Sequence, residues 1–356
     1  MAMDPAGGAD LTGGLRVGLD VGGTKVLGVL LEGEVVRATV RRPTRPGTDG
    51  VVATAAEAVR ELCADAGVEV AGLAAVGLGL PGVVEPSTGT VSHAVNLGID
   101  LSGVPVGPLL SAELGGVPVT VENDLNCAAL GAADRLGLQD MAFLALGTGV
   151  AAGLVLGGHL RRGHAGAAGE VGHLPYRADG PLCACGQRGC LELYASGSAL
   201  DAAWPDAVPA PQAVFAAAAA GEPRAVDLRA GFADAVATAV RFLVLTCDVA
   251  DVVLGGGVAQ LGTPLLEAVG DAVDRQAADS PFLRSLQLRD RLRLTSSVPV
   301  GAIGAALVTR GDAPGHGQDH DARLPDRGAS VLPGPGVAPE DRENPIETVA
   351  MTRRTH

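Results

Sequence analysis

Three cysteines crowd into one short stretch of the chain, at Cys183, Cys185 and Cys190, and His173 precedes them. One imidazole and three thiolates form the closed set of four ligands that a tetrahedral structural Zn²⁺ takes. Glycines between the cysteines let the loop fold back and bring the last thiol to the others. Three free thiols are the alternative, but in a reducing compartment the clustering beside a histidine favours a zinc site.

Three glycine-rich turns each follow a short apolar run that is typical of a strand. Successive backbone N–H groups in such a turn can cradle a phosphate, and a carboxylate at a strand end can hold Mg²⁺ through water. Each turn by itself is equally well an ordinary hairpin, and none is a Walker A loop. Together they favour a nucleotide whose two ends lie on different turns. The candidate nucleotide and Mg²⁺ residues are Asp20, Gly22, Gly23, Thr24, Lys25, Gly147, Thr148, Gly149, Gly255 and Gly256.

Asn123 and Asp124 stand between an extended segment and a helical segment. In one interpretation they are helix N-caps, a position that both residue types favour. In the other, Asp124 is a general base that accepts a proton from a hydroxyl while this hydroxyl attacks a phosphoryl group. The helix N-terminus would favour the ionised carboxylate. The sequence leaves both interpretations open.

These residues need a scaffold, and the chain alternates strand-like and helical runs, which is typical of an α/β fold. Apolar runs bounded by turn residues predict strands at 15–20, 26–31, 34–40, 73–80, 118–122 and 251–254. Apolar periodicity predicts helices at 51–66 and 125–136, and a buried helix at 236–247. Residues 19–33 can be laid over 143–158 so that their glycine turns coincide, which favours a duplicated domain over two unrelated hairpins.

The composition excludes several classes of protein. Of the 356 residues 47% are hydrophobic but only 2% aromatic, so the core must be built from Val, Leu and Ala. A net charge of −14 argues against a nucleic-acid or anionic-membrane partner, which would need a basic surface. No uncharged apolar run reaches about 18 residues, so no membrane span is expected. Residues 1–14 lack the regions of a secretory signal, so we expect a cytoplasmic protein, with disordered tails at 1–14 and 312–356.

Taken together, these motifs resemble the ROK family of repressors and sugar kinases, and most closely its glucokinases. The resemblance runs from Leu15 to Arg310, and its zinc segment is the most specific part. The matching segments are 20–25 (DVGGTK), 81–82 (PG), 122–126 (ENDLN), 146–149 (LGTG), 169–173 (GEVGH), 183–192 (CACGQRGCLE) and 254–258 (LGGGV).

The resemblance implies an actin-like (ribonuclease H-like), duplicated two-lobe ATPase fold with a structural zinc loop. The small lobe would comprise residues 15–122 and about 298–311, and the large lobe 123–297 with the zinc loop at 173–190. Asp124 would be the base for the sugar 6-hydroxyl, and the protein would be a homodimer or homotetramer. The sugar-binding residues implied are Asn123, Asp124, Glu170, His173 and Glu192.

The function implied is ATP-dependent phosphorylation of a hexose, with glucose to glucose 6-phosphate as the leading reaction and with ATP, Mg²⁺ and structural Zn²⁺ as cofactors. A kinase for another hexose or for N-acetylmannosamine is the first alternative, and polyphosphate is a donor that fits less well. A sugar-responsive ROK repressor would carry a helix-turn-helix before the first strand. The few Gly-rich residues ahead of Leu15 are too short for one, so we expect an enzyme.

Overall fold

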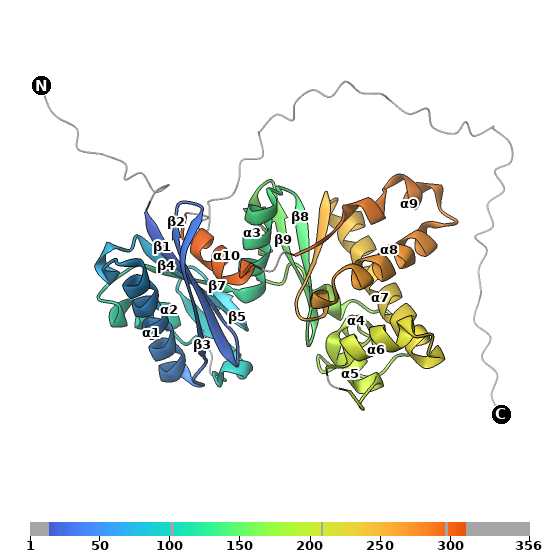
Figure 1. Cartoon of the computed structure of the whole chain (residues 1–356), viewed down its shortest axis with the longest axis horizontal. Coiled ribbons are helices and arrows are strands. Elements are labelled where there is room, and N and C mark those ends of the chain that lie inside the picture. The colour runs from blue at the N-terminus through green and yellow to red at the C-terminus, as the bar shows by residue number, and fades with distance from the viewer. Residues whose placement is uncertain (1–13, 101–102, 208, 296–297, 311–356) are drawn as a thin grey trace, which may run out of the picture. The chain divides into compact units, whose positions relative to one another are not determined.

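The computed structural model describes residues 14–100, 103–207, 209–295 and 298–310. Within them the strands of the chain form two five-stranded sheets of the same topology (Figure 1). The strand order is β3-β2-β1-β4-β7 in the first sheet and β10-β9-β8-β11-β12 in the second. In each sheet three antiparallel strands are followed by two parallel strands, which confirms the predicted duplication of an α/β unit. The segments expected to be tails, 1–14 and 312–356, lie outside the described residues apart from Gly14.

Strand bounds agree with the predicted ones to within a few residues. The first sheet comprises β1 (Leu15–Val21), β2 (Lys25–Glu32), β3 (Val35–Pro43), β4 (Ala75–Leu80) and β7 (Val119–Asn123). The second comprises β8 (Met141–Leu146), β9 (Val150–Leu156), β10 (His159–Leu160), β11 (Asp251–Gly255) and β12 (Leu292–Leu294), and β5 (Val83–Glu85) pairs with β6 (Thr90–Ser92) as a separate hairpin. The central strands β4 and β11 are buried along their whole length, because helices cover both faces of a parallel region.

Helices α1 (Thr48–Ala66) and α2 (Val106–Glu113) cover one face of the first sheet, and α10 (Val300–Val308) covers the other (Figure 1). The inward stripe of α1 includes Val51, Val59 and Leu62, which are fully buried against the sheet. The buried residues of this core are Val, Leu, Ala, Ile and Cys, as the aromatic-poor composition requires.

Helix α3 (Asp124–Leu136) lies beside α10 and packs its other side on the second sheet. The two helices touch backbone to backbone because glycines stand at the contact. A Cβ added at Gly304 would lie 1.7 Å from the Cys127 carbonyl oxygen, and one at Gly131 would lie 2.0 Å from that of Val300. This close packing holds the start of α3 next to the strand ends of the first sheet.

The remaining helices build a second core on the second sheet. They are α4 (Glu192–Ala195), α5 (Gly197–Ala203), α6 (Ala210–Ala219), α7 (Pro223–Cys247), α8 (Thr263–Ala277) and α9 (Pro281–Ser285). Short 3₁₀ helices are η1 (Val70–Gly72), η2 (Val95–Leu97), η3 (Val171–His173), η4 (Val258–Leu261) and η5 (Leu288–Arg291).

Helix α7 is longer than the predicted segment 236–247, because its first half is amphipathic and Pro223 occupies the first turn, where proline is tolerated. The helix is long and apolar enough to cross a membrane by length and composition alone. Half of its most apolar window is nevertheless buried inside the protein, where Phe232, Val236 and Val240 join the core. It is therefore a helix of the second core, which packs on the second sheet.

Candidate active site

Two carboxylates meet where strands of the first sheet end. Asp20 is near the carboxyl end of β1. Its register partner in β4 is Gly79, and Gly79 pairs with Glu122 of β7. Asp124 follows two residues later, at the start of α3. Burial, and after it the nearby Asp124 carboxylate, together raise the pKa of Asp20 to about 6, although Lys25 opposes the rise. Burial likewise raises the pKa of Asp124, and the Leu125 amide that donates to its carboxylate offsets part of this rise.

Asn123 takes the N-cap role, one of the two that the sequence left open. Its Oδ1 accepts from the backbone N–H groups of Leu125 at 3.0 Å and Asn126 at 3.3 Å, and its Nδ2 donates to the Gly82 carbonyl at 3.3 Å. Because Asn123 satisfies the helix end, Asp124 stands in the first turn, where the helix dipole stabilises an ionised carboxylate. The carboxylate is therefore available as a base.

The turn between β1 and β2 is held from outside, so that its amides stay free. Thr44 donates through Oγ1 to the Gly22 carbonyl at 2.6 Å, and the Gly22 N–H closes the turn onto the Lys25 carbonyl at 2.9 Å. Among the described residues, the N–H groups of Gly23 and Thr24 have no protein acceptor. A Cβ at Gly23 would lie 2.6 Å from the Asn96 carbonyl oxygen, so the protein itself demands this glycine. Free, clustered amides are what a phosphate oxygen requires.

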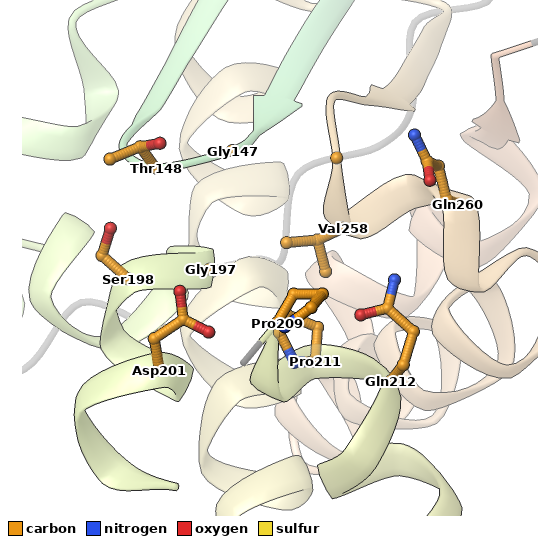
Figure 2. A pocket seen from close by; sticks show the side chains of 11 residues that line it. Gly147, Thr148, Gly197, Ser198, Asp201, Pro209, Pro211, Gln212, Val258 and Gln260 are labelled. Carbon is orange, nitrogen blue, oxygen red and sulfur yellow. The ribbon is translucent and has the colours of Figure 1, made fainter. Parts of the chain in front are cut away.

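The turn between β8 and β9 borders a cavity of about 370 Å³. Figure 2 shows Thr148 along one side of it, together with Ser198 and Asp201 of α5. Two amide side chains, Gln212 and Gln260, lie on its far side. The cavity is lined by Gly147, Thr148, Gly197, Ser198, Asp201, Pro209, Pro211, Gln212, Gly257, Val258 and Gln260. Its size and its mixed apolar and polar lining suit a nucleoside.

Glycines that line this cavity differ from the glycines that stand next to them in the chain. A Cβ at Gly147 or Gly257 would meet nothing within 4 Å, and neither residue has a positive φ, so the fold does not demand glycine there. In contrast, a Cβ added at Gly255 would lie 2.1 Å from the Phe143 ring, and Gly256 has a φ of +83°. The predicted residues Gly255 and Gly256 thus have structural reasons of their own, whereas Gly257, which the sequence-based set omitted, lines the cavity.

Glu192 supports the β8–β9 turn through a hydrogen bond to its backbone. Its Oε2 accepts from the Val150 backbone N–H at 3.0 Å, and a Cβ at Gly149 would lie 2.3 Å from the same oxygen. The role in sugar binding implied for Glu192 stays a prediction. The contact adds that this carboxylate is tied to the glycine turn.

The predicted metal ligands converge. One ligand atom from each of His173, Cys183, Cys185 and Cys190 lies within 4.8 Å of every other, and the sulfurs of Cys185 and Cys190 are 3.6 Å apart. A tetrahedral Zn²⁺ with bonds of about 2.3 Å would place its sulfurs about 3.8 Å apart. Within the loop Gly189 packs directly against the Arg177 carbonyl, and a Cβ added there would lie 1.6 Å from the oxygen, so this approach requires glycine. The donor set and its spacing fit a structural zinc ion.

The cysteine thiols of this cluster differ in how readily they lose a proton. The pKa of the Cys185 thiol falls to about 7, first because the Gln187 backbone amide bonds to its sulfur, whereas burial raises that of Cys190 to about 12. His173 Nδ1 is buried, and among the described residues it has no hydrogen-bond partner, which leaves it for a metal. Its Nε2 lies 3.9 Å from the exposed Glu170 carboxylate.

Two glycines let the segment of Glu170 and His173 pack closely against the backbone of β9. A Cβ at Gly169 would lie 1.7 Å from the Ala152 carbonyl oxygen, and one at Gly172 would lie 2.0 Å from that of Val150. The predicted site residues therefore form three groups: the strand ends at Asp20 and Asp124, the β8–β9 turn with Glu192, and the metal cluster with Glu170. Sequence reasoning missed the cavity residues from α5, α6 and η4, because no local pattern marks side chains that separate helices bring together.

The chain thus has an actin-like sugar kinase fold, with a Cys/His cluster whose spacing suits a metal ion. The chain matches the ROK family over residues 16–311, and it belongs to this family. It is 41% identical to the glucokinase of Streptomyces coelicolor over 191 residues, which is 52% of this chain and 58% of that protein. The alignment thus spans little more than half of that relative's length. The matched relatives also include N-acetylmannosamine kinases and xylose repressors.

Solved structures agree with this membership. The ROK hexokinase of Thermus thermophilus is 35% identical, with a TM-score of 0.70 over 83% of this chain and 100% of that one. The ROK family glucokinase of Streptomyces griseus, solved in complex with glucose and AMPPNP, is 31% identical, with a TM-score of 0.66 over 83% of this chain and 99% of that one.

Proposed function

We propose that this protein is an ATP-dependent hexose kinase that converts glucose to glucose 6-phosphate, with Asp124 as the general base. The pairing of Asp20 and Asp124 beside a turn with free amides carries this proposal. Two adjacent carboxylates with raised pKa values offer one group to receive a proton and another to face a cation. The similarity to glucokinases, one of them bound to glucose and AMPPNP, favours this substrate pair.

In the reaction, the ionised Asp124 accepts the proton of the sugar 6-hydroxyl as its oxygen forms a bond to the γ-phosphorus of ATP. The bond from this phosphorus to the β–γ bridging oxygen breaks, and ADP leaves. Catalysis of this kind depends on positioning and on neutralising charge. The free amides of Gly23 and Thr24 serve the phosphates, and the cavity beside Gly147 takes the nucleoside.

Asp20 would hold the Mg²⁺ that accompanies ATP, and this ion supplies charge neutralisation at the phosphates. The buried position of Asp20 beside a second carboxylate fits, because a cation would relieve their repulsion. His173 and the three cysteines would hold Zn²⁺, which supplies rigidity to the loop. Asn123, Glu170, His173 and Glu192 bind the remaining sugar hydroxyls. We place the enzyme in the cytoplasm as a homodimer or homotetramer.

The experiment is a coupled assay over a panel of hexoses and N-acetylmannosamine, with ATP and polyphosphate as donors. We expect the highest kcat/KM for glucose with ATP. A preference for N-acetylmannosamine would overturn the choice of sugar and is the second candidate, because kinases for that sugar are among the relatives.

The variant Asp124→Asn tests the base. We expect it to lower kcat by at least about 10³-fold while glucose affinity stays within several-fold, since the amide keeps its size but cannot take the proton. The matched control is Asp134→Asn on the same helix, whose carboxylate pairs with Arg135. An active Asp124→Asn enzyme would remove Asp124 from the mechanism.

A further inference from the structure

Glu122 is an acidic residue in an unusual place. It stands near the end of β7, only 2% exposed, among the few charged residues that the core of the described chain contains. Burying a carboxylate is costly unless its oxygens are paired and hydrogen-bonded. The contacts of Glu122 therefore indicate the role of this buried carboxylate.

Both oxygens of Glu122 are engaged, and each faces a different part of the molecule. Oε1 accepts from the Asn123 backbone N–H and from Asn126 Nδ2, both at 2.9 Å. Oε2 accepts from Arg162 Nε at 2.6 Å. The first oxygen thus bonds residues before and after Asp124, and so it holds the turn that begins α3.

Arg162 lies just beyond the last residue of β10, a strand of the other sheet. It stands at the start of the segment that leads to Glu170 and His173. Its carbonyl accepts from the Ala168 N–H at 3.2 Å, and the Gly169 carbonyl accepts from the Ala152 N–H at 2.7 Å. One ion pair therefore joins the turn of Asp124 to the segment that carries the other predicted sugar-binding residues.

Stability is a poor explanation for this pair. The desolvation of a buried ion pair offsets most of its attraction, and apolar residues of similar size often serve a fold as well. A bond between two separate elements, in contrast, fixes their relative position. An error of about 1 Å in such a position can cost roughly 10²-fold in rate.

We propose that Glu122 and Arg162 form a positioning pair for phosphoryl transfer, which holds the Asp124 turn in register with the segment of Glu170 and His173. Neither residue touches the reacting atoms. The proposal rests on the proposed function for its kinetic consequences, but its structural part can be tested without activity.

The kinetic test compares Arg162→Met with Arg162→Lys. For Arg162→Met we expect kcat with glucose to fall roughly 10²-fold and the KM for glucose to rise, while the KM for ATP stays unchanged, because the pair does not line the cavity beside Gly147. Arg162→Lys keeps a charge and should restore most of the activity. Glu122→Gln should also lower kcat, and the double variant Glu122→Gln/Arg162→Met should lose less than the product of the two single losses.

Arg291→Met is the matched control. Arg291 has a similarly low exposure, 23% against 27% for Arg162, and bonds the Val249 and Leu286 carbonyls far along the chain from α3. We expect Arg291→Met to lower the Tm without changing either KM or the kcat of the folded enzyme. Equal kinetic losses in Arg162→Met and Arg291→Met would overturn the proposal, as would wild-type kinetics in Arg162→Met.

Hydrogen exchange decides the structural part. The N–H groups of Asn123, Leu125 and Asn126 bond Glu122 or the Asn123 cap, so their exchange reports the turn directly. In Arg162→Met we expect faster exchange both at 122–126 and at 168–173, and no such change in Arg291→Met. Unchanged exchange, or a change in one segment alone, would overturn the pair. If the wild-type protein phosphorylated no sugar, the proposed function would fail, and this measurement would still decide whether the two segments are coupled.

Discussion

Replacing Asp20 by asparagine should make the ligand-free protein more stable at neutral pH and less active. The pKa of Asp20 rises from 3.8 to about 6, first through burial and then through Asp124. At about 1.4 kcal/mol for each pKa unit, this rise corresponds to about 3 kcal/mol. A carboxyl group whose pKa is raised on folding contributes stability at low pH and loses it as pH rises through the folded-state pKa. Above pH 7 the ionised Asp20 therefore destabilises the fold, and Asp20→Asn removes that cost.

The measurement is thermal unfolding of wild type and Asp20→Asn between pH 4 and 8, without metal or nucleotide. We expect the two Tm values to coincide near pH 4, to diverge between about pH 4 and 6, and to differ by roughly 5 °C at pH 8. Groups remote from residue 20 titrate alike in both proteins, so the difference reports Asp20 together with its interaction with Asp124. Asp65→Asn, at an exposed position of α1, should show no such dependence.

The same variant should lose at least about 10²-fold in kcat with Mg²⁺ and ATP, because the group that destabilises the fold faces the cation. A Tm difference that is constant with pH, or a less stable Asp20→Asn protein at pH 8, would refute the reasoning from burial and repulsion.

Three other changes test the remaining groups. Gly147→Ala and Gly257→Ala should leave the Tm unchanged, since the added Cβ atoms meet no protein atom, but they should raise the KM for ATP about 10-fold or more. Gly255→Ala, in contrast, should not fold stably, because its Cβ would clash with Phe143. Unchanged nucleotide kinetics in the first two variants would place ATP elsewhere. Elemental analysis should find one zinc per chain, and its removal by a chelator should lower the Tm; a metal-free protein with full activity and stability would contradict the zinc site. Glu192→Gln should keep the KM for ATP, because an amide oxygen still accepts from the Val150 N–H, whereas Glu192→Ala should raise this KM. Equal KM values in the two variants would show that Glu192 does not support the β8–β9 turn.

Much of the fold could be predicted because its signals are local. The strands of the first sheet and helices α1 and α3 each carry a periodic apolar pattern within one segment, and the repeat of the glycine turns indicated the duplication that the two sheets confirm. Helix α7 was predicted too short, because its first half buries only one face and lacks a continuous apolar run.

The candidate site was predictable only in part. Cys183, Cys185 and Cys190 are neighbours in the sequence, so a short loop suffices to bring them together, and their spacing by itself indicated a metal site. The cavity beside Gly147 was not predictable, because its walls come from helices that are distant in the sequence.

Residue types and short spacings in the sequence thus determined the repeated glycine-turn hairpins and the Cys/His cluster, since the chain forms each of them within one short segment. Only the tertiary structure decided that Asn123 caps α3 while Asp124 is left beside Asp20, and that Glu122 of β7 bonds Arg162, which follows β10. Pairings of this kind depend on how helices and strands pack, and glycine contacts such as that of Gly304 with the Cys127 backbone set how closely two helices approach. No periodicity in the chain encodes such distances.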